Sequence, residues 1–330
     1  MGNTKGFWGR LGLGRAAGAT GAEVDDDSRP GPADRTNAAD GVKGTRLGGF
    51  SLLRCVAQGG QGELHLATDI GTGLPVAIKT IHLGRSEVAC DRFMREATAA
   101  AHLQHPDIVR SYAAGTDGQG DARKGWIAME WVSGEDLGQI LAGPIRPDAA
   151  AVLLIAARVA AALAYAHRKG VLHRDIKPGN ILLQRRSGLV KLTDFGCAKT
   201  ADAAASRSGV MLGSPAYMAP EQLAGGAVDG RADFYALGVL LFQALTGRLP
   251  FDSPSLGDLL SQIAQSPAPS LPDLRPDLPK PLGLLVASLL AKQAADRPPD
   301  GDELARELCK MALACGLLHS DDAAVTRHNV

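Results

Sequence analysis

The pattern of the chain changes once, between residues 130 and 134, and this change constrains the fold more than any other feature. Before it, short runs rich in β-branched and aromatic residues alternate with glycine-rich or polar turns, and one helical pattern interrupts them at 88–103. The strand-like runs cover residues 50–56, 63–68, 76–81, 108–114 and 126–131. An antiparallel sheet that carries one main helix is the prediction for this half.

Helical periodicity dominates after Gly134. Residues 148–168 and 231–246 carry apolar side chains at helical spacing, and the second segment is apolar on most faces, as in a helix at the centre of a lobe. More helices are expected at about 256–265, 281–292 and 300–317. The sequence therefore predicts a bilobal α+β fold, with a β-rich N-lobe at 50–130, a hinge at 130–134 and a larger helical C-lobe at 135–318.

Tails are predicted at both ends of this two-lobed region. Residues 1–49 hold twelve glycines and no sustained helix or strand periodicity, which favours a disordered N-terminal tail. Residues 319–330 are predicted to form a C-terminal tail.

Composition excludes several classes of protein. Lys+Arg and Asp+Glu number 35 each, so the basic excess typical of nucleic-acid binding is absent. No unbroken apolar run approaches about 18 residues, so no transmembrane segment is predicted. The five cysteines are widely spaced without a CxxC pair, which favours inert thiols over a disulfide framework or a zinc site. We therefore expect a cytoplasmic protein with no nucleic-acid partner.

A glycine-rich segment, Val56-Ala-Gln-Gly-Gly-Gln-Gly-Glu-Leu64, joins the first two predicted strands. Glycines let backbone amides approach a phosphate, although a glycine-rich hairpin taken alone is more often an ordinary turn. No Gly-Lys-Ser/Thr follows, and a strand rather than a helix comes next, so neither a Walker loop nor a dinucleotide-binding turn is indicated.

The next strand contains Val76-Ala-Ile-Lys79, which places a lysine in an apolar run. A buried lysine needs a partner, and Glu96 in the following helix is a candidate that could aim the ammonium at a phosphate. An exposed lysine on an edge strand is the alternative reading of the same pattern.

The most informative segment is Leu172-His-Arg-Asp-Ile-Lys-Pro-Gly-Asn-Ile181, which concentrates functional side chains between two apolar runs. Asp175 can accept a hydroxyl proton, Lys177 can neutralise a phosphoryl group, and Asn180 can offer an oxygen to a hard cation. An Asp-Phe-Gly sequence follows about 14 residues later and supplies the Asp194 carboxylate for Mg²⁺.

Taken together, the order and spacing of these motifs resemble those of a eukaryotic-type (Hanks-type) serine/threonine protein kinase, over about residues 50–318. The residues of several motifs are most similar to those of the bacterial branch of the family. The resemblance implies a protein-kinase fold with ATP and Mg²⁺ between the lobes, protein substrates with Ser or Thr acceptors, and a cognate protein phosphatase as antagonist.

The resemblance also implies roles for individual residues. Those expected at the nucleotide are Val56, Ala57, Gly59, Gly60, Gly62, Leu64, Ala77, Lys79, Glu96, Met129, Glu130, Val132 and Leu182. Those expected in catalysis are Asp175, Lys177 and Lys79, with Asn180 and Asp194 as Mg²⁺ ligands. Ser214 is expected at the substrate-docking segment, and Thr200, Ser206 and Ser208 are expected sites of autophosphorylation in the activation loop.

Further roles concern the scaffold. Glu221 with Arg297 resembles the family's C-lobe ion pair, and Asp233 resembles the buried anchor of the catalytic loop. The chain departs from the family pattern at Ala57, where a glycine is usual, and at Asp107, where Asn is usual.

Two alternative functions share this fold. One is a pseudokinase that serves as a scaffold without turnover, and the other is a kinase of small molecules. The complete set of polar residues disfavours the first, and the docking segment at residues 213–221 disfavours the second.

Overall fold

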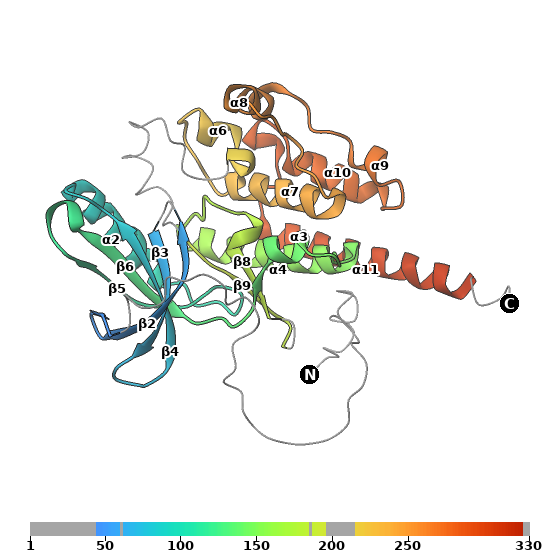
Figure 1. The fold of residues 1–330 in the computed structure, drawn as a ribbon. Coiled ribbons are helices and arrows are strands. Elements are labelled where there is room, and N and C mark those ends of the chain that lie inside the picture. Colours follow the sequence, from blue (N-terminus) through green and yellow to red (C-terminus); the bar gives the residue numbers. More distant parts are fainter. Residues whose placement is uncertain (1–43, 60–61, 185–186, 196–214, 326–330) are drawn as a thin grey trace, which may run out of the picture.

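The computed structural model describes residues 44–59, 62–184, 187–195 and 215–325, with side chains described up to residue 316. A lobe built mainly of strands lies beside a larger lobe built mainly of helices (Figure 1). This arrangement confirms the predicted bilobal α+β fold.

The N-lobe is a six-stranded antiparallel sheet in the order β1-β2-β3-β4-β6-β5. Its strands are β1 (Arg46–Leu47), β2 (Phe50–Gly59), β3 (Gly62–Asp69), β4 (Pro75–His82), β5 (Ser111–Asp117) and β6 (Lys124–Glu130). One turn of 3-10 helix, η1 (Gly120–Ala122), precedes β6. Strand β5 begins three residues later than the sequence indicated.

Two apolar clusters cover the two faces of this sheet because alternate residues of a strand point to opposite faces. In β4, Val76 and Ile78 join one cluster, whereas Ala77 joins the other. Helix α2 (Glu87–Ala101) packs on the second face through Phe93 and Ala97. The sheet and this helix therefore enclose one apolar cluster on that face of the sheet.

The folded region begins before residue 50. The predicted boundary of the tail is too late, because β1 lies inside residues 1–49 and pairs with the start of β2. Leu47 of β1 is buried in the N-lobe core, which explains why two residues of this stretch are held in the sheet. Residues 1–43 of the predicted tail lie outside the described part of the chain.

The C-lobe surrounds two long apolar helices. Its helices are α3 (Leu137–Ala142), α4 (Ala149–Arg168), α6 (Pro220–Leu223), α7 (Arg231–Thr246), α8 (Leu256–Gln265), α9 (Leu271–Leu274), α10 (Lys280–Leu289) and α11 (Gly301–Val325), with 3-10 turns η3 (Pro215–Tyr217) and η4 (Ala294–Asp296). Helices α4 and α7 supply most of the buried core, and α11 runs alongside α4 (Figure 1).

Helix α4 corrects one argument from the sequence. By length and composition it is long and apolar enough to cross a membrane, although Arg158 interrupts its apolar run. Most of α4 is buried inside the C-lobe, with Leu153, Ile155 and Leu163 fully enclosed. Its apolar character is that of a core helix.

A small three-stranded sheet, not predicted from the sequence, lies between the lobes (Figure 1). Its strands are β7 (Glu135–Asp136), β8 (Ile181–Gln184) and β9 (Leu189–Leu192), and the 3-10 turn η2 (Pro178–Asn180) precedes β8. The amide of Val109 donates to the carbonyl of Leu192 at 2.9 Å, which joins this sheet to the chain entering β5. The hairpin β8–β9 brings the segment before it and the segment after it to one place.

Candidate active site

An apolar cluster spans the junction of the two lobes. It contains the buried Ala77 and Met129, and the partly buried Leu64, Val132 and Leu182 pack against it. Five residues expected around a nucleotide base thus meet, although they come from four different strands and from the segment that follows β6. Val56, also expected there, is 38% exposed and belongs to none of the described clusters, and Gly60 lies outside the described residues.

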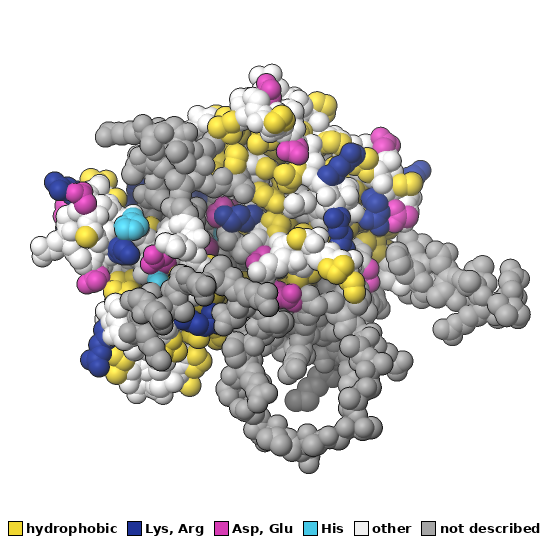
Figure 2. Space-filling view, viewed as in Figure 1, with side chains coloured by type: hydrophobic (Ala, Val, Ile, Leu, Met, Phe, Trp, Pro, Cys, Tyr) yellow, Lys and Arg dark blue, Asp and Glu magenta, His cyan; other side chains and the backbone are white. Residues whose placement is uncertain are grey.

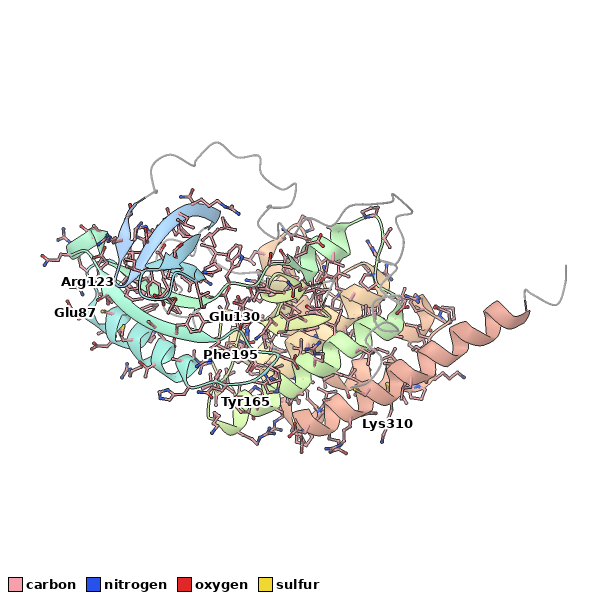
Figure 3. The ribbon with its side chains drawn as sticks, turned by 90° about the horizontal axis from the view of Figure 1, so that it is seen from below. Glu87, Arg123, Glu130, Tyr165, Phe195 and Lys310 are labelled. Carbon is pink, nitrogen blue, oxygen red and sulfur yellow. The ribbon has the colours of Figure 1, made fainter. Side chains whose placement is uncertain are left out.

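The hinge has part of its hydrogen-bonding capacity already in use. The amide of Glu130 donates to the carbonyl of Arg110 at 2.8 Å, so this amide is not available to a base. The Glu130 carboxylate instead accepts from the Lys191 ammonium at 2.8 Å. Figure 3 labels Glu130 and Phe195 in the region between the sheet and the helices. Any backbone contact to a base must come from other groups of the predicted hinge.

The glycine-rich hairpin depends on one glycine in particular. Gly62 has φ of +133°, and a Cβ added there would lie 1.7 Å from the carbonyl oxygen of Thr80 on β4. Its partner Gly59 has open space around the corresponding position. Gly62 therefore lets the hairpin fold down against β4, where Leu64 stands opposite Lys79.

Lys79 forms an ion pair with Asp194, with 2.8 Å between its Nζ and Oδ1. Burial alone would raise the pKa of Asp194, but the charge and hydrogen bond of Lys79 outweigh this effect and hold the pKa below its ordinary value. Asp194 is therefore ionised at neutral pH. The sequence predicted Glu96 of α2 as the partner of Lys79; that pairing stays a prediction, whereas the Lys79–Asp194 pair was not foreseen.

Three polar side chains of the catalytic-loop motif are in direct contact. The Lys177 ammonium lies 2.8 Å from Asp175 Oδ2. The Asn180 amide donates to the Asp175 carbonyl at 2.7 Å and to Oδ2 at 3.0 Å. Because this amide nitrogen faces Asp175, the Asn180 amide oxygen is left to face away as an acceptor.

Asp233 of α7 holds the start of this loop. Its carboxylate accepts from the backbone amides of His173 at 2.9 Å and Arg174 at 2.7 Å, and from His167 Nε2 at 2.8 Å. Arg174 has φ of +66°, a conformation that costs energy for a residue with a side chain. These hydrogen bonds hold the loop in that conformation, so Asp233 is the buried anchor that the sequence predicted.

His173 connects the loop to the segment that carries Asp194. Its Nε2 donates to the carbonyl of Thr193 at 2.8 Å, and its Nδ1 accepts from the amide of Asp175 at 3.3 Å. The Phe195 ring packs on the imidazole with 4.6 Å between the centroids. The amide of Thr193 also donates to the carbonyl of Asn180 at 3.0 Å. The hydrogen bonds of His173 and Thr193 thus fix the segments that carry Asp175 and Asp194 relative to each other.

Sequence reasoning missed two polar contacts between distant segments. Lys191 is buried, and donates to Glu130 and to the carbonyl of Ile108. Asp107, which departs from the family pattern, is buried and accepts from Arg158 of α4. The signal for both was a charged residue at a position surrounded by apolar ones, because a buried charge requires a partner.

The predicted ion pair between Glu221 and Arg297 forms with two hydrogen bonds, at 2.7 and 2.8 Å. All three guanidinium nitrogens also donate to backbone carbonyls, so the buried charge is well compensated. This pair lies in the C-lobe scaffold. The predicted phosphorylation sites Thr200, Ser206 and Ser208 and the docking residue Ser214 lie outside the described residues.

The arrangement is suited to transfer of a charged group. Next to the apolar cluster the site holds a carboxylate that can accept a proton and a lysine beside it. It also holds a second lysine and two oxygen ligands for a hard cation. Such a set positions a phosphate chain and neutralises the charge that develops on it.

Comparison with known proteins agrees with this chemistry. The family model described as "Protein kinase domain" matches residues 50–312. Serine/threonine-protein kinase pkn2 of Myxococcus xanthus is 40% identical over 272 residues, which is 79% of this chain and 32% of that protein. PksC, a serine/threonine-protein kinase of Streptomyces coelicolor, is 38% identical over 80% of this chain and 49% of its own length. The chain thus spans half or less of these relatives.

Solved structures give the same result. The PknI kinase domain of Mycobacterium tuberculosis is 33% identical, with a TM-score of 0.66 over 82% of this chain and 98% of that one. The fold of the two lobes is therefore that of a solved kinase domain.

Proposed function

Because this chain belongs to the protein kinase family, we propose that it transfers the γ-phosphate of ATP to serine and threonine hydroxyls of proteins. The resemblance of its motifs predicted this family. The observation that carries the proposal is the cluster of Asp175, Lys177 and Asn180, joined through Thr193 to the Lys79–Asp194 pair. These hydrogen-bonded residues place a proton acceptor, Asp175, close to the positive charges that a phosphate needs.

Each polar residue has one task in this reaction. Asp175 accepts the proton of the incoming hydroxyl and orients it, while Lys177, 2.8 Å away, neutralises charge on the transferring phosphoryl group. Lys79 binds the α- and β-phosphates of ATP. Positioning and charge neutralisation are the main requirements of phosphoryl transfer, and these residues meet both.

The residues present fit Mg²⁺ as the metal. Asp194 is ionised, and the Asn180 amide oxygen faces away from Asp175, so the two supply the oxygen ligands that this cation prefers. Asp194 and Asn180 would hold Mg²⁺, which would supply positive charge to offset that of the phosphates. With nucleotide bound, Lys79 would contact phosphate oxygens in place of Asp194.

The apolar cluster at the lobe junction is the proposed site of the adenine ring. Ala77 and Leu182 flank the ring, Met129 closes the back and Leu64 covers it. The hairpin at Gly59 and Gly62 lies over the phosphates. Methyl-bearing Ala57 stands opposite Leu64 in this hairpin and reduces backbone freedom there.

A purified sample tests the proposal directly. Incubation with Mg²⁺, ATP labelled at the γ-phosphate and a generic protein substrate is expected to give phosphoserine and phosphothreonine after acid hydrolysis. Lys79→Met and Asp194→Asn are expected to abolish the label. Absence of transfer by the wild-type chain, with ATP still bound, would instead support the pseudokinase alternative, and label only on small molecules would support a small-molecule kinase.

Regulation by phosphorylation at Thr200, Ser206 or Ser208 is part of the same proposal. Supporting it, Arg174 beside the catalytic Asp175 has a buried Nε without a hydrogen-bond partner among the described residues, and a phosphate is a strong acceptor for such a group. Phosphopeptide mapping after incubation with Mg²⁺ and ATP tests it. No phosphate in residues 198–212, or unchanged activity of Ser206→Ala/Ser208→Ala, would contradict it.

The proposed setting is the cytoplasm, where ATP is plentiful and thiols stay reduced, with a protein phosphatase that reverses the reaction. Positive and negative side chains are interspersed on the face seen in Figure 2, consistent with the zero formal net charge. Cell fractionation with an antibody against the chain tests the location.

A further inference from the structure

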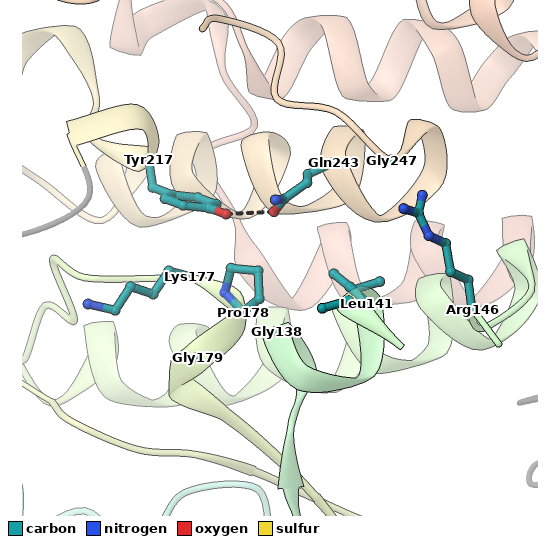
Figure 4. A pocket seen from close by; sticks show the side chains of 10 residues that line it. Gly138, Leu141, Arg146, Lys177, Pro178, Gly179, Tyr217, Gln243 and Gly247 are labelled. Atoms are coloured by element: carbon teal, nitrogen blue, oxygen red, sulfur yellow. Dashed lines mark hydrogen bonds between the residues drawn. The ribbon is translucent and has the colours of Figure 1, made fainter. Parts of the chain in front are cut away.

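A cavity of about 470 Å³ opens in the C-lobe beside the catalytic residues. Helix α3, the turn η2, η3 and the end of α7 form its walls, through residues that include Leu141, Arg146, Lys177, Pro178, Tyr217 and Gln243. Figure 4 shows Lys177 at one end and Arg146 at the other. Because Lys177 also contacts Asp175, a chain lying in this cavity would run away from the point of phosphoryl transfer.

The walls between the two ends have no negative charge. Leu141 and Pro178 are apolar, and the Tyr217 hydroxyl donates to Gln243 Oε1 at 2.5 Å. Burial raises the pKa of Tyr217 to about 12, so the ring stays neutral. The cavity therefore offers apolar and neutral polar walls with a cation at each end.

Arg146 carries a charge that the described residues do not compensate. The side chain is exposed, and it has no ion pair or hydrogen bond to any described residue. The acidic residues nearest in sequence are engaged elsewhere: Asp136 accepts from the amide of Gln139 at the start of α3, and Asp148 accepts from the amide of Ala151 at the start of α4.

Arg146 lies against Gly247 at the end of α7. Gly247 ends α7 with φ of +79°, and a Cβ added there would lie 2.0 Å from Arg146 Nη1. The positive φ at this helix end favours glycine by itself, so the short distance shows only that the Arg146 guanidinium packs over the end of α7 at the cavity wall.

We propose that Arg146, at the opposite end of this cavity from Lys177, selects protein substrates with an acidic residue a few positions from the acceptor hydroxyl. The inference rests on the proposed kinase function and assigns its substrate class. The guanidinium binds the substrate carboxylate with two hydrogen bonds, while Leu141 and Pro178 contact the aliphatic part of the peptide.

Peptide binding tests the inference without relying on turnover. Fluorescent serine peptides that differ only by Asp or Lys, moved through each position on both sides of the serine, are titrated against the full chain and followed by anisotropy. At one position or a pair of adjacent positions, the Asp peptide is expected to bind about five- to tenfold more tightly. Arg146→Met is expected to remove this preference and Arg146→Glu to reverse it.

Arg248→Met is the matched control, because Arg248 is exposed beside Gly247 but does not line the cavity. It removes the same charge and is expected to keep the preference for Asp. Equal binding of Asp and Lys peptides by the wild-type chain, or an unchanged preference in Arg146→Met with an unchanged melting temperature, overturns the inference. Phosphorylation of a generic protein substrate, measured in parallel, reports separately on the kinase function.

Discussion

At the residue scale, the position of Asp175 follows from hydrogen bonds that begin at Asp233. Asp233 fixes the backbone of His173 and Arg174, and the His173 imidazole then bonds the amide of Asp175 on one side and the carbonyl of Thr193 on the other. The imidazole can make both bonds only in its neutral form, with the proton on Nε2. The geometry of the catalytic loop therefore depends on the protonation of one buried histidine.

This dependence gives a prediction about pH. Burial lowers the pKa of His173 below its ordinary value of 6.5, so below that pH the unfolded chain binds more protons than the folded one. The free energy of unfolding is expected to decrease as pH falls below 6.5, by up to about 1.4 kcal/mol per pH unit from this group. Urea denaturation at several pH values between 5 and 8 measures it.

The variant His173→Gln is expected to flatten that slope, while His82→Gln, at an exposed position, keeps it. An identical pH dependence in wild type and His173→Gln would show that this histidine does not titrate as the structure indicates.

At the scale of elements, strand and helix patterns of the sequence predicted the longer pieces well. The bounds of α7 and α8 agree with the apolar periodicity because each helix buries one face or all of its surface. The short elements α3, β7 and β8 were not predicted, since two to six residues carry too little periodicity to stand out, whereas the motif before Asp194 did indicate the strand that is β9. The β8–β9 hairpin is what brings Asp194 to the catalytic loop.

The site could be predicted residue by residue, but its pairings could not. The motifs identified Asp175, Lys177, Asn180 and Asp194 because their spacing is specific. That Lys79 contacts Asp194 depends on how the two lobes meet, which no local pattern contains. The contact between Lys191 and Glu130 could not be predicted for the same reason, because it also depends on how the lobes meet.

The glycine hairpin gives a prediction for an element. Gly62→Ala would place a methyl group 1.7 Å from a backbone oxygen at a positive φ, so the hairpin must move away from β4. We expect the KM for ATP to rise by about tenfold, with a lower melting temperature. Gly59→Ala, which meets no neighbouring atom, is expected to change the melting temperature little. Equal losses of stability in both variants would contradict this account of the hairpin.

At the scale of the whole molecule, polar contacts tie the two lobes together beside the apolar cluster. Lys191 of β9 binds Glu130 of β6, and the chain at Asp107, which leads into β5, bonds to β9 and to Arg158 of α4. Both contacts lie where the N-lobe meets the small sheet. Relative motion of the lobes is therefore expected to pivot near these residues.

The start of the fold gives a prediction for the molecule as a whole. Deleting residues 1–43 is expected to leave the melting temperature within about 1 °C, whereas deleting 1–49 removes β1 and the buried Leu47 and is expected to lower it by a few degrees. Differential scanning calorimetry distinguishes the two. A large loss from the shorter deletion would show that residues before Gly44 stabilise the N-lobe.

The most direct test of the central claim is the effect of Asp175→Asn on transfer and on ATP binding, measured in the same preparation. Asp175 is proposed to act on the acceptor hydroxyl, and the apolar cluster and Lys79 on the nucleotide. Phosphotransfer to a protein substrate is therefore expected to fall by about 10²- to 10⁴-fold, while the Kd for Mg²⁺–ATP stays within about twofold. Turnover close to that of the wild type would contradict the assignment of Asp175 and, with it, the mechanism proposed for this chain.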